Sequence, residues 1–184
     1  LLLGIYNENR QGIIYCVAGK RVHHNYGGGL LEHTLEVLDY CKIAAKHQPK
    51  INKDILVAGA LLHDIGKLFE YDCQSVTYDN TLRGKLLGGH IVLGRDFIRE
   101  NYPQDFPEEL GLALEHLILS HHGFKEWGAV EEPKTIEAVA LHCADLLSAR
   151  VNQAGLILKD VAAGEWSSFD KFLGTSLYYD NKRN

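Results

Sequence analysis

The chain has 184 residues, of which 46% are hydrophobic and 23% are charged, and its formal net charge is −5 with a pI of about 6.0. This length suits one compact domain with a sizeable core, and the composition excludes the disordered and fibrous classes. The acidic balance also argues against the broad basic surface that grips long nucleic acids, so any contact with nucleic acid should be local.

The sequence has no feature that indicates a membrane or a secretory route. No apolar run approaches the roughly 18–20 residues of a membrane span, and no basic residues precede the apolar start at residues 1–3. The four cysteines, Cys16, Cys41, Cys73 and Cys143, form no C-x-x-C pair, which favours buried free thiols in a reducing compartment. We therefore expect a cytoplasmic protein with no membrane partner.

Helical patterns dominate the first half of the chain. Residues 1–22 are mixed and predict no clear element, and glycines 27–29 then form a hinge into a helix that runs from about residue 30 to His47. Asn52 is a plausible N-cap for a second helix, which should end near Gly66. Residues 71–84 are typical of a loop that contains at most a short hairpin.

Three further helices are predicted downstream. One runs from about Lys85 to Ile98, the next starts at Pro107 and ends before Gly123, and the last starts at Pro133. We therefore predict an all-α fold, a helical bundle of about six main helices. Its expected parts are an N-terminal segment at 1–19, one domain at 20–158 and an aromatic tail at 159–184 that packs on the bundle or on a partner.

The central motif is His63-Asp64, which is followed by Gly66 and Lys67. An imidazole and a carboxylate side by side at a helix end can both approach a metal ion, and the glycine lets the backbone turn away directly. Helices of a bundle can direct further ligands inward onto shared ions. The other candidate ligands, each near a helix end or on a helix, are His33, His90, His121 and Asp145.

Asp64 could bridge two ions through its two carboxylate oxygens. The remaining ligands of the two sites would be His33, His63 and Asp145 for one ion, and His90 and His121 for the other. Such nitrogen and oxygen ligands favour one or two divalent transition-metal ions, Mn, Fe, Co, Ni or Zn, with Mg as an alternative.

Several neighbouring residues have open interpretations. His122 could be a ligand, a substrate contact or a hydrogen-bond donor, whereas His142 is interpreted as structural. Lys67 is predicted either to stabilise charge on a reacting phosphate or to act only as a partner of a helix dipole. Arg150 and Lys125 are weaker candidates for phosphate contacts.

The order His33, His63-Asp64 and Asp145 on helices resembles the HD superfamily of metal-dependent phosphohydrolases. The added His90 and His121 are similar to the dinuclear branch of that superfamily. Four runs also resemble the HD domain of YhaM-type 3′–5′ exoribonucleases, and they lie at residues 23–34, 84–91, 119–123 and 141–150. The run at 84–91 contains one glycine more than this resemblance leads us to expect.

The resemblance implies an HD-domain bundle that cleaves phosphoester bonds of nucleotides or of short single-stranded RNA or DNA by attack of a metal-activated hydroxide. YhaM-type enzymes resemble a fusion in which an OB-fold precedes the HD domain, whereas only some twenty residues precede the matching region here. Two alternatives stay open: a phosphatase of free nucleotides, and a non-catalytic module that senses nucleotides. A homo-oligomer is a further expectation.

Overall fold

The computed structural model describes residues 1–20, 24–73, 75 and 77–180. Within these residues the regular structure is helical, and the bridges Tyr71–Asn80, Trp166–Tyr178 and Asp170–Thr175 do not extend into strands. The predicted all-α class is confirmed. No helix in the described part of the chain is both long and apolar enough to cross a membrane. His23, and Val76 of the expected hairpin, lie outside the described residues.

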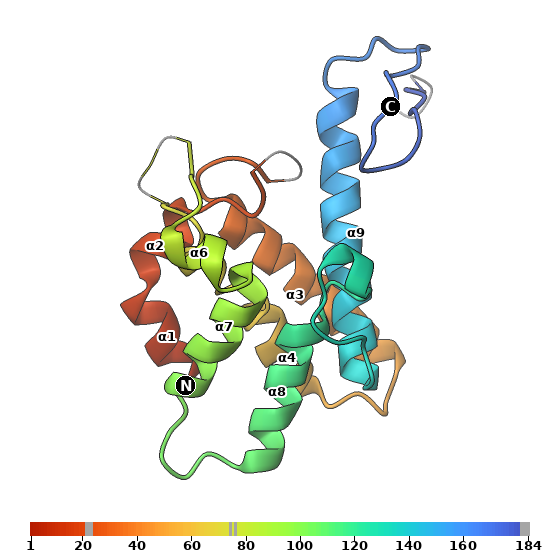
Figure 1. Ribbon diagram of the computed structural model, residues 1–184. Helices are drawn as coiled ribbons and strands as arrows, with labels where there is room; N and C mark the ends of the chain where they lie inside the picture. The colour runs from red at the N-terminus through yellow and green to blue at the C-terminus, as the bar shows by residue number, and fades with distance from the viewer. Residues whose placement is uncertain (21–23, 74, 76, 181–184) are drawn as a thin grey trace.

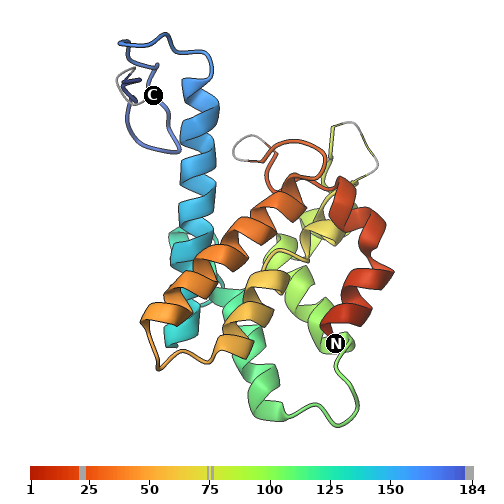
Figure 2. The same ribbon diagram turned by 180° about the vertical axis from the view of Figure 1, so that it is seen from behind.

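Five helices of ten or more residues form the body of the described structure (Figures 1 and 2). They are α3 (Gly29–His47), α4 (Lys53–Leu62), α7 (Gly89–Glu100), α8 (Glu108–Ser120) and α9 (Ile136–Leu158). Helix α4 packs against α3, α8 and α9, and α7 packs against α8. The far end of α9 projects from the bundle, and the C-terminal tail folds back beside it (Figure 1).

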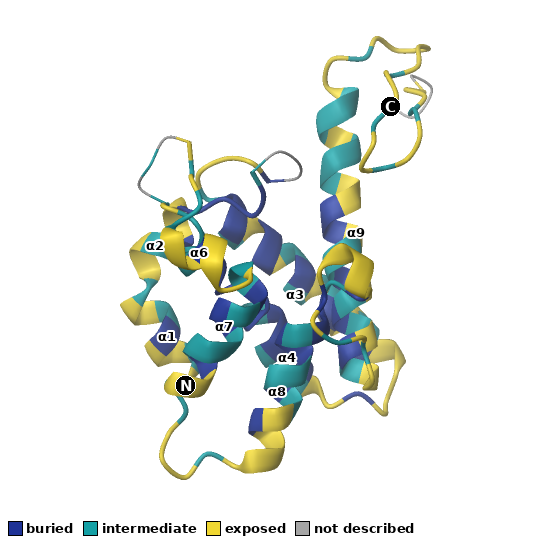
Figure 3. Cartoon of the chain, in the orientation of Figure 1, coloured by how far each residue is buried: buried dark blue, intermediate teal, exposed yellow. Residues whose placement is uncertain are grey.

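Two hydrophobic clusters hold these helices together. The larger joins α3, α4, α8 and α9 through side chains such as Val37, Leu56, Leu117 and Leu141, all of them buried. Figure 3 shows the buried residues on the facing sides of these helices. Because each buried side chain of this size stabilises the fold by about 1.5–3 kcal/mol, packing rather than helix propensity determines how the helices are arranged.

The N-terminal segment is part of this body. It forms two short helices, α1 (Leu2–Glu8) and α2 (Arg10–Tyr15), where the sequence pattern predicted no clear element. Ile5 and Ile13 are buried in the second cluster, against apolar residues that follow α4 and lie on α7 and α8. Helices of seven and six residues are shorter than the window of about 11–18 residues over which helical periodicity can be recognised.

The helix expected from Lys85 is divided in two. Helix α6 (Leu82–Leu86) begins after Thr81, whose hydroxyl accepts a hydrogen bond from a backbone amide of the first turn. Gly88 and Gly89 then adopt φ angles of 85° and 75°, in a region that L-residues with a side chain rarely occupy. The two glycines therefore end one helix and start the next.

The starts of helices α4 and α9 are set by capping side chains. Asn52 caps α4 as predicted, because its side-chain oxygen accepts hydrogen bonds from the amides of Asp54 and Ile55. The last long helix starts later than its expected start at Pro133, since Thr135 is the residue that caps it. Pro107 is the N-cap of α8 instead of its first residue.

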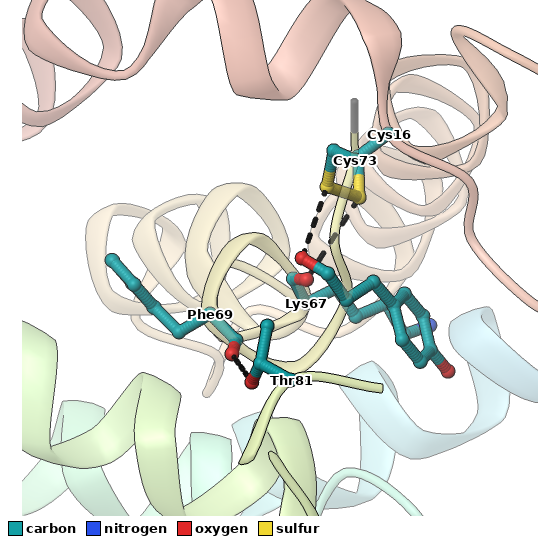
Figure 4. The surroundings of a disulfide bond; sticks show 6 residues. Cys16, Lys67, Phe69, Cys73 and Thr81 are labelled. Atoms are coloured by element: carbon teal, nitrogen blue, oxygen red, sulfur yellow. Dashed lines mark hydrogen bonds between the residues drawn. A yellow bond between two sulfur atoms is a disulfide. The ribbon is translucent and has the colours of Figure 1, made fainter. Parts of the chain in front are cut away.

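The expectation of free thiols is wrong for two of the four cysteines. Cys16, directly after α2, and Cys73, in the loop that follows α5 (Lys67–Glu70), form a disulfide (Figure 4). The two residues are 57 positions apart in the sequence, and only the fold brings their Cα atoms to 4.8 Å. Cys41 is a buried free thiol as expected, whereas Cys143 is free but exposed.

Candidate metal centre

Seven polar side chains meet where five helices converge. They come from α3, the end of α4, the start of α7, the end of α8 and the middle of α9: His33, His63, Asp64, His90, His121, His122 and Asp145. The structure thus brings together all six residues predicted as ligands, and His122 lies with them. Three of the seven, His33, His63 and His121, are at most 1% exposed.

The first half of the centre is formed around one oxygen of Asp64. Its Oδ2 lies 3.5 Å from Nε2 of His33 and 3.5 Å from Nε2 of His63. The two imidazole Nε2 atoms are 3.2 Å apart, and Oδ1 of Asp145 is 3.0 Å from Nε2 of His33. Four potential ligand atoms therefore face one point.

The second half is formed around the other oxygen of Asp64. Its Oδ1 lies 3.5 Å from Nε2 of His90 and 3.7 Å from Nε2 of His121. Nε2 of His122 is 3.3 Å from Nε2 of His90. Asp64 is thus the residue shared by the two halves.

These separations, from 3.0 to 3.7 Å, are close to those that divalent ions impose on their ligands. Metal–ligand bonds of about 2.0–2.2 Å place neighbouring ligand atoms roughly 2.8–3.6 Å apart in octahedral or tetrahedral geometry. Oδ1 of Asp64 and Nε2 of His121 are also buried and have no hydrogen-bond partner within the described residues. Because a buried polar atom without a partner is costly, both atoms are explained by a cation between them.

Three of the imidazoles are oriented by backbone carbonyls. In each, Nδ1 donates to a carbonyl oxygen: His63 to Ala60 (2.9 Å), His121 to Ile118 (2.7 Å) and His122 to Trp127 (2.9 Å). Since a carbonyl can only accept, Nδ1 carries the proton and Nε2 directs its lone pair to the centre. This is the tautomer that a metal ligand requires.

His90 is oriented by a carboxylate that the sequence analysis missed. Glu70, at the end of α5, accepts hydrogen bonds from Nδ1 of His90 at 2.7 Å and from its backbone amide at 3.1 Å. Burial disfavours the charged form of Glu70, but these bonds from His90 keep the pKa of its carboxyl below the ordinary value. The ionised carboxylate therefore fixes both the position and the tautomer of His90.

His33 is oriented by a relay of two further residues. Oγ of Ser148 donates to a carboxylate oxygen of Glu36 at 2.6 Å, so the same Oγ accepts from Nδ1 of His33 at 2.9 Å. Glu36 follows His33 by three residues, and Ser148 follows Asp145 by three. That spacing, which places two side chains on one helix face, is the sequence pattern that could have identified both.

Replacing Ser148 tests the relay. Ser148→Ala removes the acceptor of His33 Nδ1, and we expect metal affinity to fall about 10- to 100-fold with the fold retained. Competition with a chelating dye measures the affinity, and Ser148→Thr, which keeps a hydroxyl, should restore part of it. The exposed Ser168→Ala is the control. Wild-type affinity in Ser148→Ala would show that the relay does not support the metal centre.

Lys67 lies inside the centre. Its side chain is almost fully buried, and its Nζ donates to Oδ2 of Asp64 at 2.5 Å. Burial disfavours ionisation of Asp64, but Lys67, followed by His63, holds the pKa of this carboxyl well below its usual range. Because the ammonium group is paired with a carboxylate at the centre, the first of its two predicted roles, charge stabilisation, is favoured.

Gly66 serves a different purpose from the predicted one. Its φ of −65° is ordinary right-handed helical backbone, so no glycine is needed for the turn. A Cβ at this position would instead overlap the carbonyl oxygen of His90 and the amide of Gly94. Glycine is therefore required because the backbones of α5 and α7 touch here, and this contact holds His90 against Asp64.

A pocket of about 230 Å³ opens beside the centre. Asp64, Lys67 and Asp145 contribute to its lining, together with His142, whose Nδ1 lies 2.8 Å from the carbonyl oxygen of His121. The structural interpretation of His142 is thus incomplete, because it also faces this pocket. A larger cavity of about 1040 Å³, lined by residues such as Tyr71, contains no residue of the metal centre, so we place the chemistry in the smaller pocket.

The two weaker phosphate candidates lie away from this pocket. Lys125 is exposed and its Nζ is 3.7 Å from a carboxylate oxygen of Glu131. Arg150 is exposed on α9. Neither contributes to the lining of the pocket, and their contact with phosphate stays a prediction.

The histidines should make the metal-free protein sensitive to acid. Burial, followed by repulsion from His90, lowers the pKa of His122 from 6.5 to about 4. As the pH falls, His122 is therefore protonated in the unfolded chain before it is protonated in the folded protein. The free energy of unfolding should decrease between about pH 6.5 and pH 4 as a result. Urea unfolding across this range should show a smaller decrease for His122→Asn, whereas the exposed His47→Asn should follow the wild type. If the free energy of unfolding decreased as much in His122→Asn as in the wild type, His122 would not be a source of the acid sensitivity.

The family model described as HD domain matches residues 30–150, which include every residue of the centre. Three similar relatives bear the name 3′–5′ exoribonuclease YhaM. The relative from Oceanobacillus iheyensis is 42% identical, and the match covers 91% of this chain and 52% of the relative. The relative from Shouchella clausii is 34% identical, with 95% of this chain and 54% of the relative covered. The relative from Listeria welshimeri is 36% identical, with 82% of this chain and 48% of the relative covered. The chain thus spans about half the length of the curated relatives it matches.

Two solved structures of the HD domain of the Listeria monocytogenes phosphodiesterase PgpH are also similar. The first covers 88% of this chain and 74% of that chain, with 16% identity and a TM-score of 0.49. The second, in complex with cyclic-di-AMP, covers 82% and 72%, with 17% identity and the same TM-score. This similarity is too distant to transfer a site or a substrate.

Proposed function

Since this chain belongs to the HD domain family, we propose that it is a metal-dependent phosphohydrolase that cleaves phosphoester bonds of nucleotides or of single-stranded nucleic acid. One observation carries the proposal: five imidazoles and two carboxylates converge on the two halves of one centre, and the Nδ1 atom of every imidazole is held by an acceptor. A structural histidine cluster has no need for five Nε2 lone pairs directed at one another.

The two halves of the centre would each hold one divalent ion. The first would be bound by His33, His63, Asp64 and Asp145, and the second by Asp64, His90, His121 and His122. The nitrogen and oxygen donors suit Mn, Fe, Co, Ni or Zn. Such ions, when bound, polarise phosphoryl oxygens and lower the pKa of a water molecule toward neutrality.

The side chains of the centre have separate tasks in this proposal. Asp64 would contribute a ligand oxygen to each of the two ions. The Lys67 ammonium group, already within the centre, neutralises charge that develops on the phosphoryl oxygens. Asp64 and Lys67 are buried between the helices, so little water surrounds them. The low exposure strengthens the attraction of Asp64 for the ions and of Lys67 for the phosphoryl oxygens.

The relatives' name, exoribonuclease, supports RNA as the substrate, and the net charge of −5 favours a short contact over tracking along a long strand. A phosphatase of free nucleotides is the alternative that the same centre serves equally well. A cytoplasmic location is part of the proposal, and the Cys16–Cys73 disulfide, a kind of bond that is rare in reducing compartments, is an observation against it.

The test uses protein that is stripped of metal and then reloaded with Mn²⁺. We expect hydrolysis of bis(p-nitrophenyl) phosphate and of a short RNA oligonucleotide, with release of mononucleotides from its 3′ end, and no hydrolysis before reloading. Turnover of mononucleotides without cleavage of RNA would favour the phosphatase. Metal bound at the centre with no turnover of any phosphoester would contradict the enzymatic proposal and favour a sensor.

A further inference from the structure

Part of the lining of the pocket beside the centre is aromatic. Trp127 and Phe172 both line it, and both remain partly exposed, at 48% and 37%. Trp127 belongs to the short η1 helix (Lys125–Trp127) after α8, whereas Phe172 comes from the C-terminal tail. Two aromatic rings from distant parts of the chain therefore reach the same small cavity as the metal centre.

The floor of the pocket is a single stripe of α9. His142, Asp145, Leu146 and Ala149 all line the cavity, and their spacing of three, one and three residues places them on one helix face. Asp145 faces His33 of the centre, at 3.0 Å. The apolar part of the floor thus adjoins a metal-ligand candidate directly.

Trp127 is fixed relative to the centre by its own backbone. Its carbonyl oxygen accepts the hydrogen bond from Nδ1 of His122. Its indole ring packs edge-on against Phe124, with the ring centroids 4.8 Å apart, and lies 6.2 Å from the ring of His142. The residue that orients a histidine of the centre therefore also presents an aromatic ring next to it.

We propose that this pocket, which we call the Trp127–Phe172 pocket, is a nucleobase subsite, where the base of the nucleotide whose phosphate lies at the metal centre stacks on these rings. The inference rests on the proposed function and adds the part of the substrate that is recognised. Aromatic stacking tolerates every base, because each base has a π-face. The apolar lining beyond the centre offers stacking surface, so the subsite should bind bases with little sequence preference.

The experiment compares two short RNA substrates that differ only in the 3′-terminal nucleotide, which is intact in one and abasic in the other. The Mn²⁺-loaded wild type should cleave the intact substrate with a kcat/KM about 5- to 150-fold higher, the range expected for stacking of one base. Trp127→Ala and Phe172→Ala should reduce this ratio toward one, because they should lower the rate on the intact substrate by a larger factor than the rate on the abasic substrate.

The tail offers matched controls. Trp166 and Phe169 are more exposed than their counterparts, at 69% and 64%, and lie outside the lining of the pocket. Trp166→Ala and Phe169→Ala should keep the wild-type ratio. A wild type that cleaves both substrates equally, or pocket variants that lose both activities in proportion, would overturn the subsite.

A binding measurement separates this inference from the proposed function. In a Trp166→Phe background, Trp127 is the remaining tryptophan. Its fluorescence should be quenched by AMP and unchanged by ribose 5-phosphate, whether or not any phosphoester is hydrolysed. If AMP quenches the fluorescence but no phosphoester is hydrolysed, the subsite is retained and the enzymatic proposal is rejected. If phosphoesters are hydrolysed but AMP and ribose 5-phosphate have the same effect on the fluorescence, the enzymatic proposal is retained and the subsite is rejected.

Discussion

Asp64→Asn should lower kcat on any phosphoester substrate by about 10²–10³-fold or more, because it weakens the binding of the ions that would stabilise transition-state charge. Both oxygens of Asp64 are used, since Oδ2 faces His33 and His63 while Oδ1 faces His90 and His121. Asparagine keeps the shape but offers one neutral oxygen. The measurement is kcat together with bound Mn²⁺ per chain, which should fall as well.

The fold should survive this change, because the two side chains have nearly the same volume. Circular dichroism and thermal unfolding of the metal-free protein check this point. Asp105→Asn, in the exposed connection between α7 and α8, is the matched control and should retain full activity. If Asp64→Asn protein that binds no metal turned over at the wild-type rate, the proposed mechanism would have to be abandoned.

Gly66→Ala should damage both the fold and the centre. The added Cβ meets the backbone of His90 and Gly94, which cannot move aside as a flexible side chain would. Overpacking of this kind costs about 1–3 kcal/mol of the free energy of unfolding. Because α7 must shift to relieve the overlap, His90 should move away from Asp64, and we expect the second ion to be lost. Urea unfolding and Mn²⁺ stoichiometry measure the two effects.

A matched glycine lies on α9. Gly155 is an exposed helical residue, and a Cβ there would meet nothing within 4 Å. Gly155→Ala should therefore be neutral or stabilise the fold by up to about 1 kcal/mol, through helix propensity alone. Equal stability and equal metal content in the Gly66→Ala and wild-type proteins would show that the contact between α5 and α7 does not position His90.

The candidate ligands could be predicted because each interrupts an apolar helical pattern. His63 and Asp64 follow Leu61-Leu62, and His33 follows Leu30-Leu31, so these polar groups lie on faces that the helices bury. A buried polar group needs a partner, and several such groups on separate helices indicate a shared one. That inference combines local periodicity, which the sequence carries, with the resemblance of the His-Asp pattern to the HD superfamily.

The contacts that support the ligands could not be found in the same way, although the three-residue spacing from Asp145 places Ser148 on the matching helix face. Glu70 contacts His90 across 20 residues, and Ser148 contacts His33 across 115, so both contacts depend on how the helices pack. The disulfide between Cys16 and Cys73 has the same character, since its spacing matches no motif. The role of Gly66 was also missed, because a close approach between two backbones leaves no trace in a sequence pattern.

The central claim is that Asp64 is shared by two divalent ions. Anomalous diffraction from crystals grown with Mn²⁺ tests it most directly. The account predicts two peaks about 3.5–4 Å apart, one beside His33 and Asp145 and the other beside His90 and His122. Crystals saturated with Mn²⁺ that show one peak or no peak near the Asp64 carboxylate would contradict it.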